Sequence, residues 1–99
     1  SVDVRGKSMG SIEELSAMRD KIDEIDSRLS ELFLERMKVS TKIAKIKKEG
    51  NIAVENRNRE LQVIERLTSG REEDEAGYLT ALYEKIFEIS KDAQRKLKL

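Results

Sequence analysis

The chain contains no cysteine and no histidine among its 99 residues. Proteins use these two side chains as their strongest nucleophile, commonest general base and commonest metal ligand. We therefore expect no zinc centre, no other metal site and no histidine-based triad. An enzyme with this composition must work with carboxylates, lysine, arginine, amides and hydroxyls. The lack of disulfides fits a reducing cytoplasm, which is the compartment that we expect.

Long apolar runs, proline and an excess of one charge are also missing. No run approaches the roughly 18 apolar residues of a membrane span, and no signal-peptide pattern is present. Lys+Arg and Asp+Glu balance at 20 each, so no net charge favours nucleic acid. Charged residues make up 40% of the chain and aromatic residues 4%, which is typical of long helices with solvated polar faces. We expect one all-α domain that binds neither membrane nor nucleic acid.

A very long first helix is predicted near the N-terminus. Residues 1–10 show no helical periodicity and are expected to be a flexible leader or an expression remnant, with the folded domain covering 11–99. Ser11, followed three residues later by Glu14, has the pattern of a capping box. No glycine or proline follows until Gly50. The helix is therefore expected to run for about 38 residues, or about 57 Å.

Two shorter helices are predicted after a break at residues 50–56. Asn56 is suited to cap the second helix, which runs to about Ser69 and ends at Gly70. The acidic residues 70–77 are expected to form an exposed connection to the third helix. That helix carries an apolar face made of Leu79, Leu82, Tyr83, Ile86, Phe87, Ile89, Ala93 and Leu97.

The first helix carries an apolar stripe that is too long for its neighbours to cover. Its members follow a 3-4 spacing and are Leu15, Met18, Ile22, Ile25, Leu29, Leu32, Val39, Ile43 and Ile46. The second and third helices span only about 21 and 35 Å. The missing cover is expected from a second copy of the chain, which predicts an intertwined two-fold homodimer of three-helix chains.

Five polar residues stand in or beside apolar stripes. Arg36 occupies a stripe position of the first helix, and Lys47, eleven residues later, shares its face. Glu60 lies one turn before Ile64, at the start of the apolar stripe that Leu61, Ile64 and Leu67 form on the second helix, while Ser90 and Gln94 lie in register on the third. Each alone has an ordinary structural explanation, such as a paired arginine or a snorkelling lysine. Together they predict a polar pocket between helices.

Arg19 fits such a pocket only in a dimer. It lies 17 residues before Arg36, about 25 Å away along the same helix, so one chain could not hold one small ligand with both. If two first helices run antiparallel about an axis near residue 27 or 28, Arg19 of one copy meets Arg36 of the other. The alternative is that Arg19 is a surface residue that pairs with Asp23.

The order and spacing of these residues resemble the all-helical type of chorismate mutase, the chorismate mutase II family. The resemblance covers about residues 12–97. The positions that carry it are Arg19 in the first turns, Glu35-Arg36, Lys47 eleven residues later, Arg59-Glu60 in "NRNRE", and Ser90 and Gln94 in the last helix. The family is an intertwined dimer of three-helix chains that converts chorismate to prephenate, on the route to phenylalanine and tyrosine, without a cofactor.

The resemblance implies a reaction that needs neither histidine nor cysteine. Chorismate rearranges by a [3,3] sigmatropic shift, an isomerisation in which no proton moves and no covalent intermediate forms. By resemblance, Arg36 and Arg19 of the partner chain hold the two substrate carboxylates in a site shared between the copies. Lys47 and Gln94 would donate to the ether oxygen, where negative charge grows.

The remaining site residues are also implied by the resemblance. Glu60 would accept from the ring hydroxyl with Arg59 close by, and Ser90 would help to seat a carboxylate. Asn56 stands where family members often have aspartate, so we expect a modest loss of hydroxyl recognition. Many members have a proline in the preceding loop, where this chain has Ala53. We expect that loop to be looser.

Two other functions stay open. A lyase that removes pyruvate from isochorismate has the same fold and a substrate of similar charge, although the full "NRNRE" motif and Gln94 favour the mutase. A non-catalytic helical dimerisation module needs only the apolar stripe. This second alternative does not explain why polar residues face the interior. It predicts that Arg36→Leu would stabilise the protein at no cost in activity.

Overall fold

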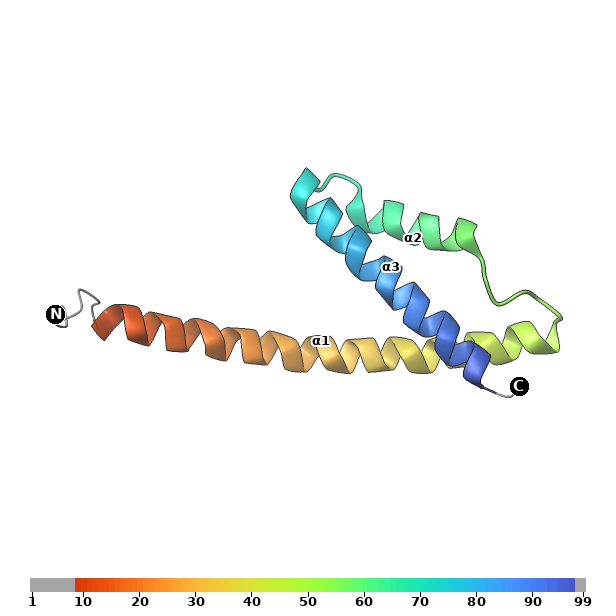
Figure 1. Ribbon diagram of the computed structural model, residues 1–99, viewed down its shortest axis with the longest axis horizontal. Helices are drawn as coiled ribbons and strands as arrows, with labels where there is room; N and C mark the ends of the chain where they lie inside the picture. Colours follow the sequence, from red (N-terminus) through yellow and green to blue (C-terminus); the bar gives the residue numbers. More distant parts are fainter. Residues whose placement is uncertain (1–8, 98–99) are drawn as a thin grey trace. The chain divides into compact units, whose positions relative to one another are not determined.

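The computed structural model describes residues 9–97 and places three helices in them, with no strand in that part of the chain. These are α1 (Met9–Glu49), α2 (Arg57–Thr68) and α3 (Glu73–Lys96) (Figure 1). The predicted all-α fold with one very long N-terminal helix is confirmed. The chain divides after Arg36 into two units. The first holds the N-terminal part of α1, and the second holds the last turns of α1 with α2 and α3.

The start of α1 differs from the prediction. The helix begins at Met9, so Ser11 lies inside the first turn and is not the N-cap. The first four N–H groups of a helix have no partner within the helix wherever it starts, so extending it by two residues leaves no more of them unpaired. Of the predicted leader, residues 9 and 10 are helical, and residues 1–8 lie outside the described part.

The end of α1 confirms the predicted break and shows how it is made. The Ile52 N–H donates to the Lys47 carbonyl at 2.7 Å, and the Asn51 N–H donates to the Lys48 carbonyl at 3.2 Å. Asn51 has a φ of 54°, in the left-handed region that asparagine tolerates better than most residues. This is the Schellman pattern, which satisfies the last carbonyls and turns the chain out of the helix.

The limits of α2 agree with the prediction. The Asn56 side chain accepts from the Arg59 N–H at 3.1 Å, which satisfies one of the free donors at the helix start. At the other end, the Ser69 N–H donates to the Glu65 carbonyl. Gly70 follows with a φ of 75°, a conformation that glycine adopts without steric cost.

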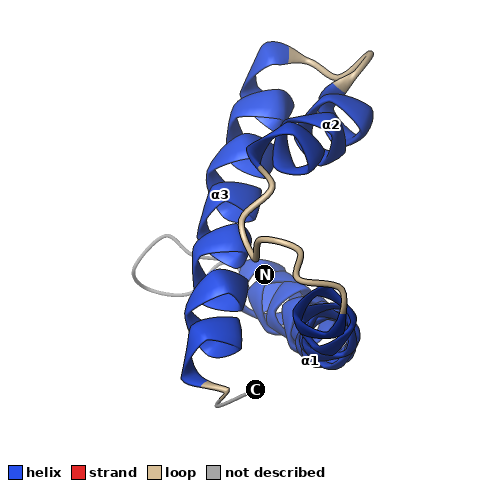
Figure 2. Cartoon of the chain, turned by 90° about the vertical axis from the view of Figure 1, so that its right-hand side faces the viewer, coloured by secondary structure: helices blue, strands red, loops and turns tan. Residues whose placement is uncertain are grey.

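The third helix begins earlier than predicted. Residues 73–77 were expected to belong to an exposed connection, but α3 starts at Glu73. Its first turn contains Glu73, Asp74 and Glu75, and negative side chains stabilise a helix N-terminus through the helix dipole. The connection is thus only four residues long, and α3 turns back beside α2 (Figures 1 and 2).

The second unit has a small core. Its buried apolar residues are Ala44 of α1, Val63 of α2, and Ile86 and Phe87 of α3. Tyr83 and Phe87 add an edge-to-face contact with ring centroids 6.0 Å apart. Each fully buried apolar side chain contributes about 1.5–3 kcal/mol. A core with so few of them stabilises a single chain only modestly.

The first unit leaves its part of the apolar stripe uncovered. Its six members, Leu15, Met18, Ile22, Ile25, Leu29 and Leu32, are 48–62% exposed in the single chain. Contiguous apolar surface of this kind marks an interaction site on a water-exposed protein. None of the helices within residues 9–97 combines the length and the apolar character needed to cross a membrane.

Candidate active site

The second unit contains six of the eight residues predicted for the site. They lie on all three of its elements and are Lys47 in the last turn of α1, Asn56 at the N-cap of α2, Arg59 and Glu60 in the first turn of α2, and Ser90 and Gln94 on α3. Glu60 and Ser90 are buried, Lys47 and Gln94 are half-buried, and Asn56 and Arg59 are exposed. Arg19 and Arg36 belong to the first unit, and their part in this site stays a prediction.

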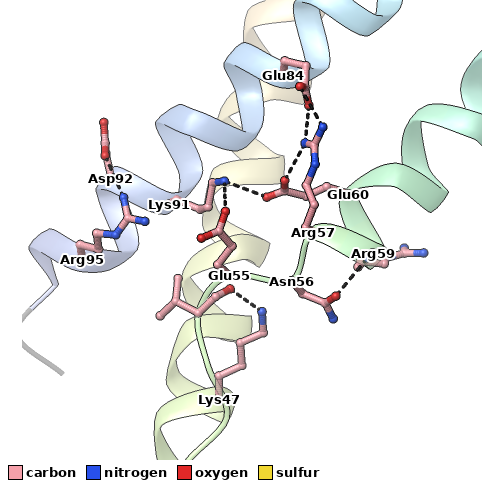
Figure 3. Close-up of polar contacts among 11 residues, drawn as sticks. Lys47, Glu55, Asn56, Arg57, Arg59, Glu60, Glu84, Lys91, Asp92 and Arg95 are labelled. Carbon is pink, nitrogen blue, oxygen red and sulfur yellow. Dashed lines mark hydrogen bonds and ion pairs between the residues drawn. The ribbon is translucent and has the colours of Figure 1, made fainter.

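The ammonium group of Lys47 is held by the loop between α1 and α2. Its Nζ donates to the Val54 carbonyl at 2.8 Å, seven residues further on (Figure 3). A substrate oxygen could take the place of this carbonyl without any change in the helix. The backbone of Lys47 is fixed independently, because its own carbonyl takes part in the Schellman pattern.

Ser90 and Gln94 turn from α3 toward the last turns of α1. Gln94 Nε2 donates to Ser40 Oγ at 2.7 Å and to the Ser40 carbonyl at 3.1 Å. The Ser90 hydroxyl lies 3.5 Å from Met37 Sδ, a weak acceptor. The amide group of Gln94 is therefore oriented by its contacts with Ser40.

Glu60 is a buried carboxylate held between two cations. Its Oε1 lies 3.1 Å from Arg57 Nη1, and its Oε2 lies 3.2 Å from Lys91 Nζ (Figure 3). Burial of an ionised carboxylate is costly unless it is paired, and here both oxygens have a partner. A carboxylate offers about four lone-pair directions, so this arrangement leaves acceptor capacity for a further hydroxyl.

The two cations extend the contacts of Glu60 into a longer network. Arg57 also forms a two-pronged pair with Glu84 at 2.7 and 3.2 Å, and Lys91 contacts Glu55 at 3.1 Å. The hydrogen bond from Arg57 lowers the pKa of Glu84, and the one from Lys91 lowers the pKa of Glu55. In return, Glu55 and then Glu60 raise the pKa of Lys91. The network connects α2, α3 and the loop through side chains that are all in their charged forms.

Two hollows of the second unit adjoin these residues. One, of about 500 Å³, is lined by residues of α1, the loop and α3, namely Ala44, Lys48, Asn51, Ile52, Ala53, Val54, Gln94 and Leu97. The other, of about 220 Å³, is lined by Arg57, Glu60, Glu84, Phe87, Glu88, Lys91 and Arg95. The first is within the size range of small-molecule sites. Within residues 9–97, no three acidic, histidine or cysteine side chains gather as a metal site would require.

Comparison with known proteins identifies the family to which the chain is related. Residues 18–95 match the family model described as chorismate mutase type II. The chain belongs to the chorismate mutase type II family. The match includes every residue predicted for the site, from Arg19 to Gln94.

Three relatives of known name illustrate the relationship. The chain is 28% identical over 93 residues to a bifunctional chorismate mutase/prephenate dehydratase of Aquifex aeolicus, covering 89% of this chain and 26% of that protein. It is 34% identical over 85 residues to a protein of the same name from Buchnera aphidicola, covering 84% and 22%. It is 36% identical over 56 residues to a chorismate mutase of Methanocaldococcus jannaschii, covering 57% of each. No solved structure is similar enough to be matched with the chain.

The chain spans only part of these relatives. It corresponds to about a quarter of each bifunctional protein and to just over half of the archaeal chorismate mutase. The similarity therefore establishes the chorismate mutase type II domain.

Sequence reasoning missed the cations on either side of Glu60. Arg57 and Lys91 lie 34 positions apart, and neither occupies a stripe position. Arg57 lies within the "NRNRE" motif, but the sequence analysis gives it no role. A local signal did exist for Lys91, because it directly follows Ser90 and lies three residues before Gln94. Its partner on α2 could not be identified before the register of α2 against α3 was known.

The network predicts a specific acid sensitivity of this chorismate mutase type II domain. Because Arg57 lowers the pKa of Glu84 from its ordinary 4.5, their pairing stabilises the fold above that value, and the contribution is lost as pH falls through the lowered pKa. We expect the melting temperature to fall less steeply between about pH 5 and pH 3 in Glu84→Gln than in the wild type. Thermal unfolding followed by circular dichroism measures this. Glu65→Gln, at an exposed position of α2, is the control, and equal slopes in all three proteins would contradict the prediction.

Proposed function

We propose that this domain rearranges chorismate to prephenate by a [3,3] sigmatropic shift. Membership of the family supports the proposal. The observation that supports it most is that Lys47, Glu60, Ser90 and Gln94 are all buried or half-buried and lie on the three helices of one small unit. A pericyclic shift needs positioning and charge stabilisation rather than a base or nucleophile. A chain without histidine and cysteine can supply both.

Each residue has a role that its environment suits. Lys47 and Gln94 donate to the ether oxygen of the breaking bond, and they do so by exchanging the Val54 carbonyl and the Ser40 oxygens for the substrate. Because both groups are already fixed, little reorganisation is required when negative charge develops. Arg36 and Arg19 of a second copy hold the substrate carboxylates, where a guanidinium can bind in bidentate fashion.

The other predicted residues recognise the ring and one carboxylate. Glu60 accepts from the ring hydroxyl, with Arg59 nearby on the same turn of α2. Ser90 helps to seat a carboxylate. Asn56 keeps its capping hydrogen bond to the Arg59 N–H, so the replacement of the family's usual aspartate preserves the start of α2.

We further propose that the active protein is an intertwined homodimer with shared active sites. The exposed apolar stripe of the first unit supports this, because a second α1 can cover it over its full length. A copy that runs antiparallel also supplies Arg19 to the site that contains Arg36. The cytoplasm stays the predicted compartment.

Product analysis of the wild-type protein tests the proposed activity. Purified protein is given chorismate and, separately, isochorismate, and the loss of chorismate absorbance is followed while prephenate, pyruvate and salicylate are measured. We expect prephenate from chorismate and no pyruvate. Pyruvate and salicylate from isochorismate would identify the lyase instead. A well-folded dimer that consumes neither substrate would leave only the dimerisation module.

A further inference from the structure

A side chain outside the predicted site residues controls the most buried acid of the unit. Lys91 lies on α3 directly after Ser90, and its Nζ is 3.2 Å from Glu60 Oε2 and 3.1 Å from Glu55 Oε1. Its side chain is only 20% exposed, and that of Glu60 is 10% exposed. Water screens a pair of this kind less than it screens a surface ion pair.

The position of Lys91 restricts Glu60 more strongly than that of the second cation does. Arg57 reaches the other oxygen, Oε1, but its side chain is 49% exposed and it also binds Glu84 in bidentate fashion. Lys91 and Arg57 reach Glu60 from α3 and α2 respectively (Figure 3). Because each oxygen is held from a separate element, rotation of the carboxylate would break at least one charge-assisted hydrogen bond.

Lys91 also connects Glu60 to the loop between α1 and α2. Its second partner, Glu55, belongs to this loop and directly follows Val54, whose carbonyl holds the ammonium group of Lys47. The pKa of Lys91 is raised by Glu55 first and by Glu60 second, as expected for a cation between two carboxylates. One side chain therefore contacts two acids, one beside the Lys47 acceptor and one on α2.

We propose that Lys91 is a positioning residue of the reaction, which acts by aiming the Glu60 carboxylate at the ring hydroxyl of the substrate. This inference rests on the proposed function. Lys91 itself donates to Glu60 and does not contact the reacting atoms. Without it, Oε2 has no cation to fix it, and the buried carboxylate turns toward Arg57 alone. A misplacement of about 1 Å in a site of this kind costs as much as a hundredfold in rate.

The test is a double-mutant cycle between Lys91 and Glu60, with Lys85→Met as control. Lys85 lies on the same helix and pairs with Glu88 in an exposed pair, so its replacement removes the same charge from α3. We expect Lys91→Met to lower kcat/KM for chorismate by about ten- to a hundredfold, mainly through kcat, and Lys85→Met to change it by less than about twofold. In the Glu60→Gln background, Lys91→Met should change kcat/KM by less than about threefold, because the group that it positions has been removed.

The outcomes separate this inference from the proposed function. If the wild type does not convert chorismate, the proposed function and the role of Lys91 both fail. If the wild type is active but Lys91→Met has the same effect with and without Glu60, Lys91 does not act through Glu60 and only the inference is overturned. Lys91→Arg guards against a folding defect, because it keeps the cation and should recover most of the lost kcat/KM. Failure of Lys91→Arg to recover activity, with an unchanged melting temperature, also overturns the inference.

Discussion

Replacing Lys47 with alanine is expected to lower kcat/KM for chorismate by more than about a hundredfold. In the proposed mechanism the ammonium group of Lys47 donates to the ether oxygen, and in the structure this group is held by the Val54 carbonyl at 2.8 Å. Removal of one donor to a developing negative charge costs roughly 10²–10³ in kcat. The initial rate of chorismate loss at several substrate concentrations measures kcat and KM separately. We expect most of the fall in kcat, because the interaction strengthens in the transition state.

Lys45→Ala is the matched control for this change. Lys45 is an exposed lysine two residues earlier in α1, on the opposite side of the helix. Its loss removes the same charge and leaves the site intact, so kcat/KM should stay within about twofold of the wild type. A Lys47→Ala variant with the wild-type helical content that retains more than about a tenth of the activity would contradict the role of Lys47.

Placing a glutamate in the middle of the apolar stripe is expected to weaken the proposed dimer strongly. Ile22 is 55% exposed in the single chain. In a two-fold dimer the substitution is present in both copies, so its cost counts twice. Losing the burial of one isoleucine costs about 1.5–3 kcal/mol. The dimer contains two such substitutions, and each also places a glutamate charge where it must be desolvated. Together they should raise the dissociation constant at least a hundredfold. Sedimentation velocity over a range of concentrations measures this for Ile22→Glu. Turnover of chorismate should fall in parallel, because Arg19 is then withheld from the site.

Ser27→Glu introduces the same charge on the other side of α1. Ser27 is exposed and lies about 170° around the helix from the centre of the apolar stripe. We expect this variant to remain a dimer with nearly wild-type activity. Equal dissociation constants for the two variants would show that the apolar stripe is not the interface.

The helices could be predicted from sequence where the deciding interactions are local. The cap of α2 needs only Asn56 and the N–H three residues ahead, and the end of α1 needs only the six residues from Lys47 to Ile52. The predicted beginning of α3 is wrong because the sequence analysis interprets residues 73–75 as part of a solvated charged connection. The same three acids stabilise a helix N-terminus, and composition alone does not distinguish the two. Ser11 was assigned as a cap for the same kind of reason, although the helix starts at Met9.

The residues proposed for the site could be selected from the sequence, but their contacts could not. Glu60, Lys47 and Gln94 stand out because polar side chains in or beside an apolar stripe need partners. Their partners are Lys91, the Val54 carbonyl and Ser40. Two of these lie on other helices, and one is a backbone atom in a loop. Their identity depends on how α2, α3 and the end of α1 pack, which helical periodicity does not specify.

A heterodimer of two inactive variants gives the most direct test of a chorismate mutase whose sites are shared between copies. Arg19→Ala and Lys47→Ala chains with different affinity tags are co-expressed, and the mixed dimer is isolated through both tags. If each site takes Arg19 from one copy and Lys47 from the other, the mixed dimer holds one intact site. It should then show about half of the wild-type rate of prephenate formation, while each variant alone shows almost none. A mixed dimer as inactive as its parents, or an Arg19→Ala homodimer with full activity, would contradict the account.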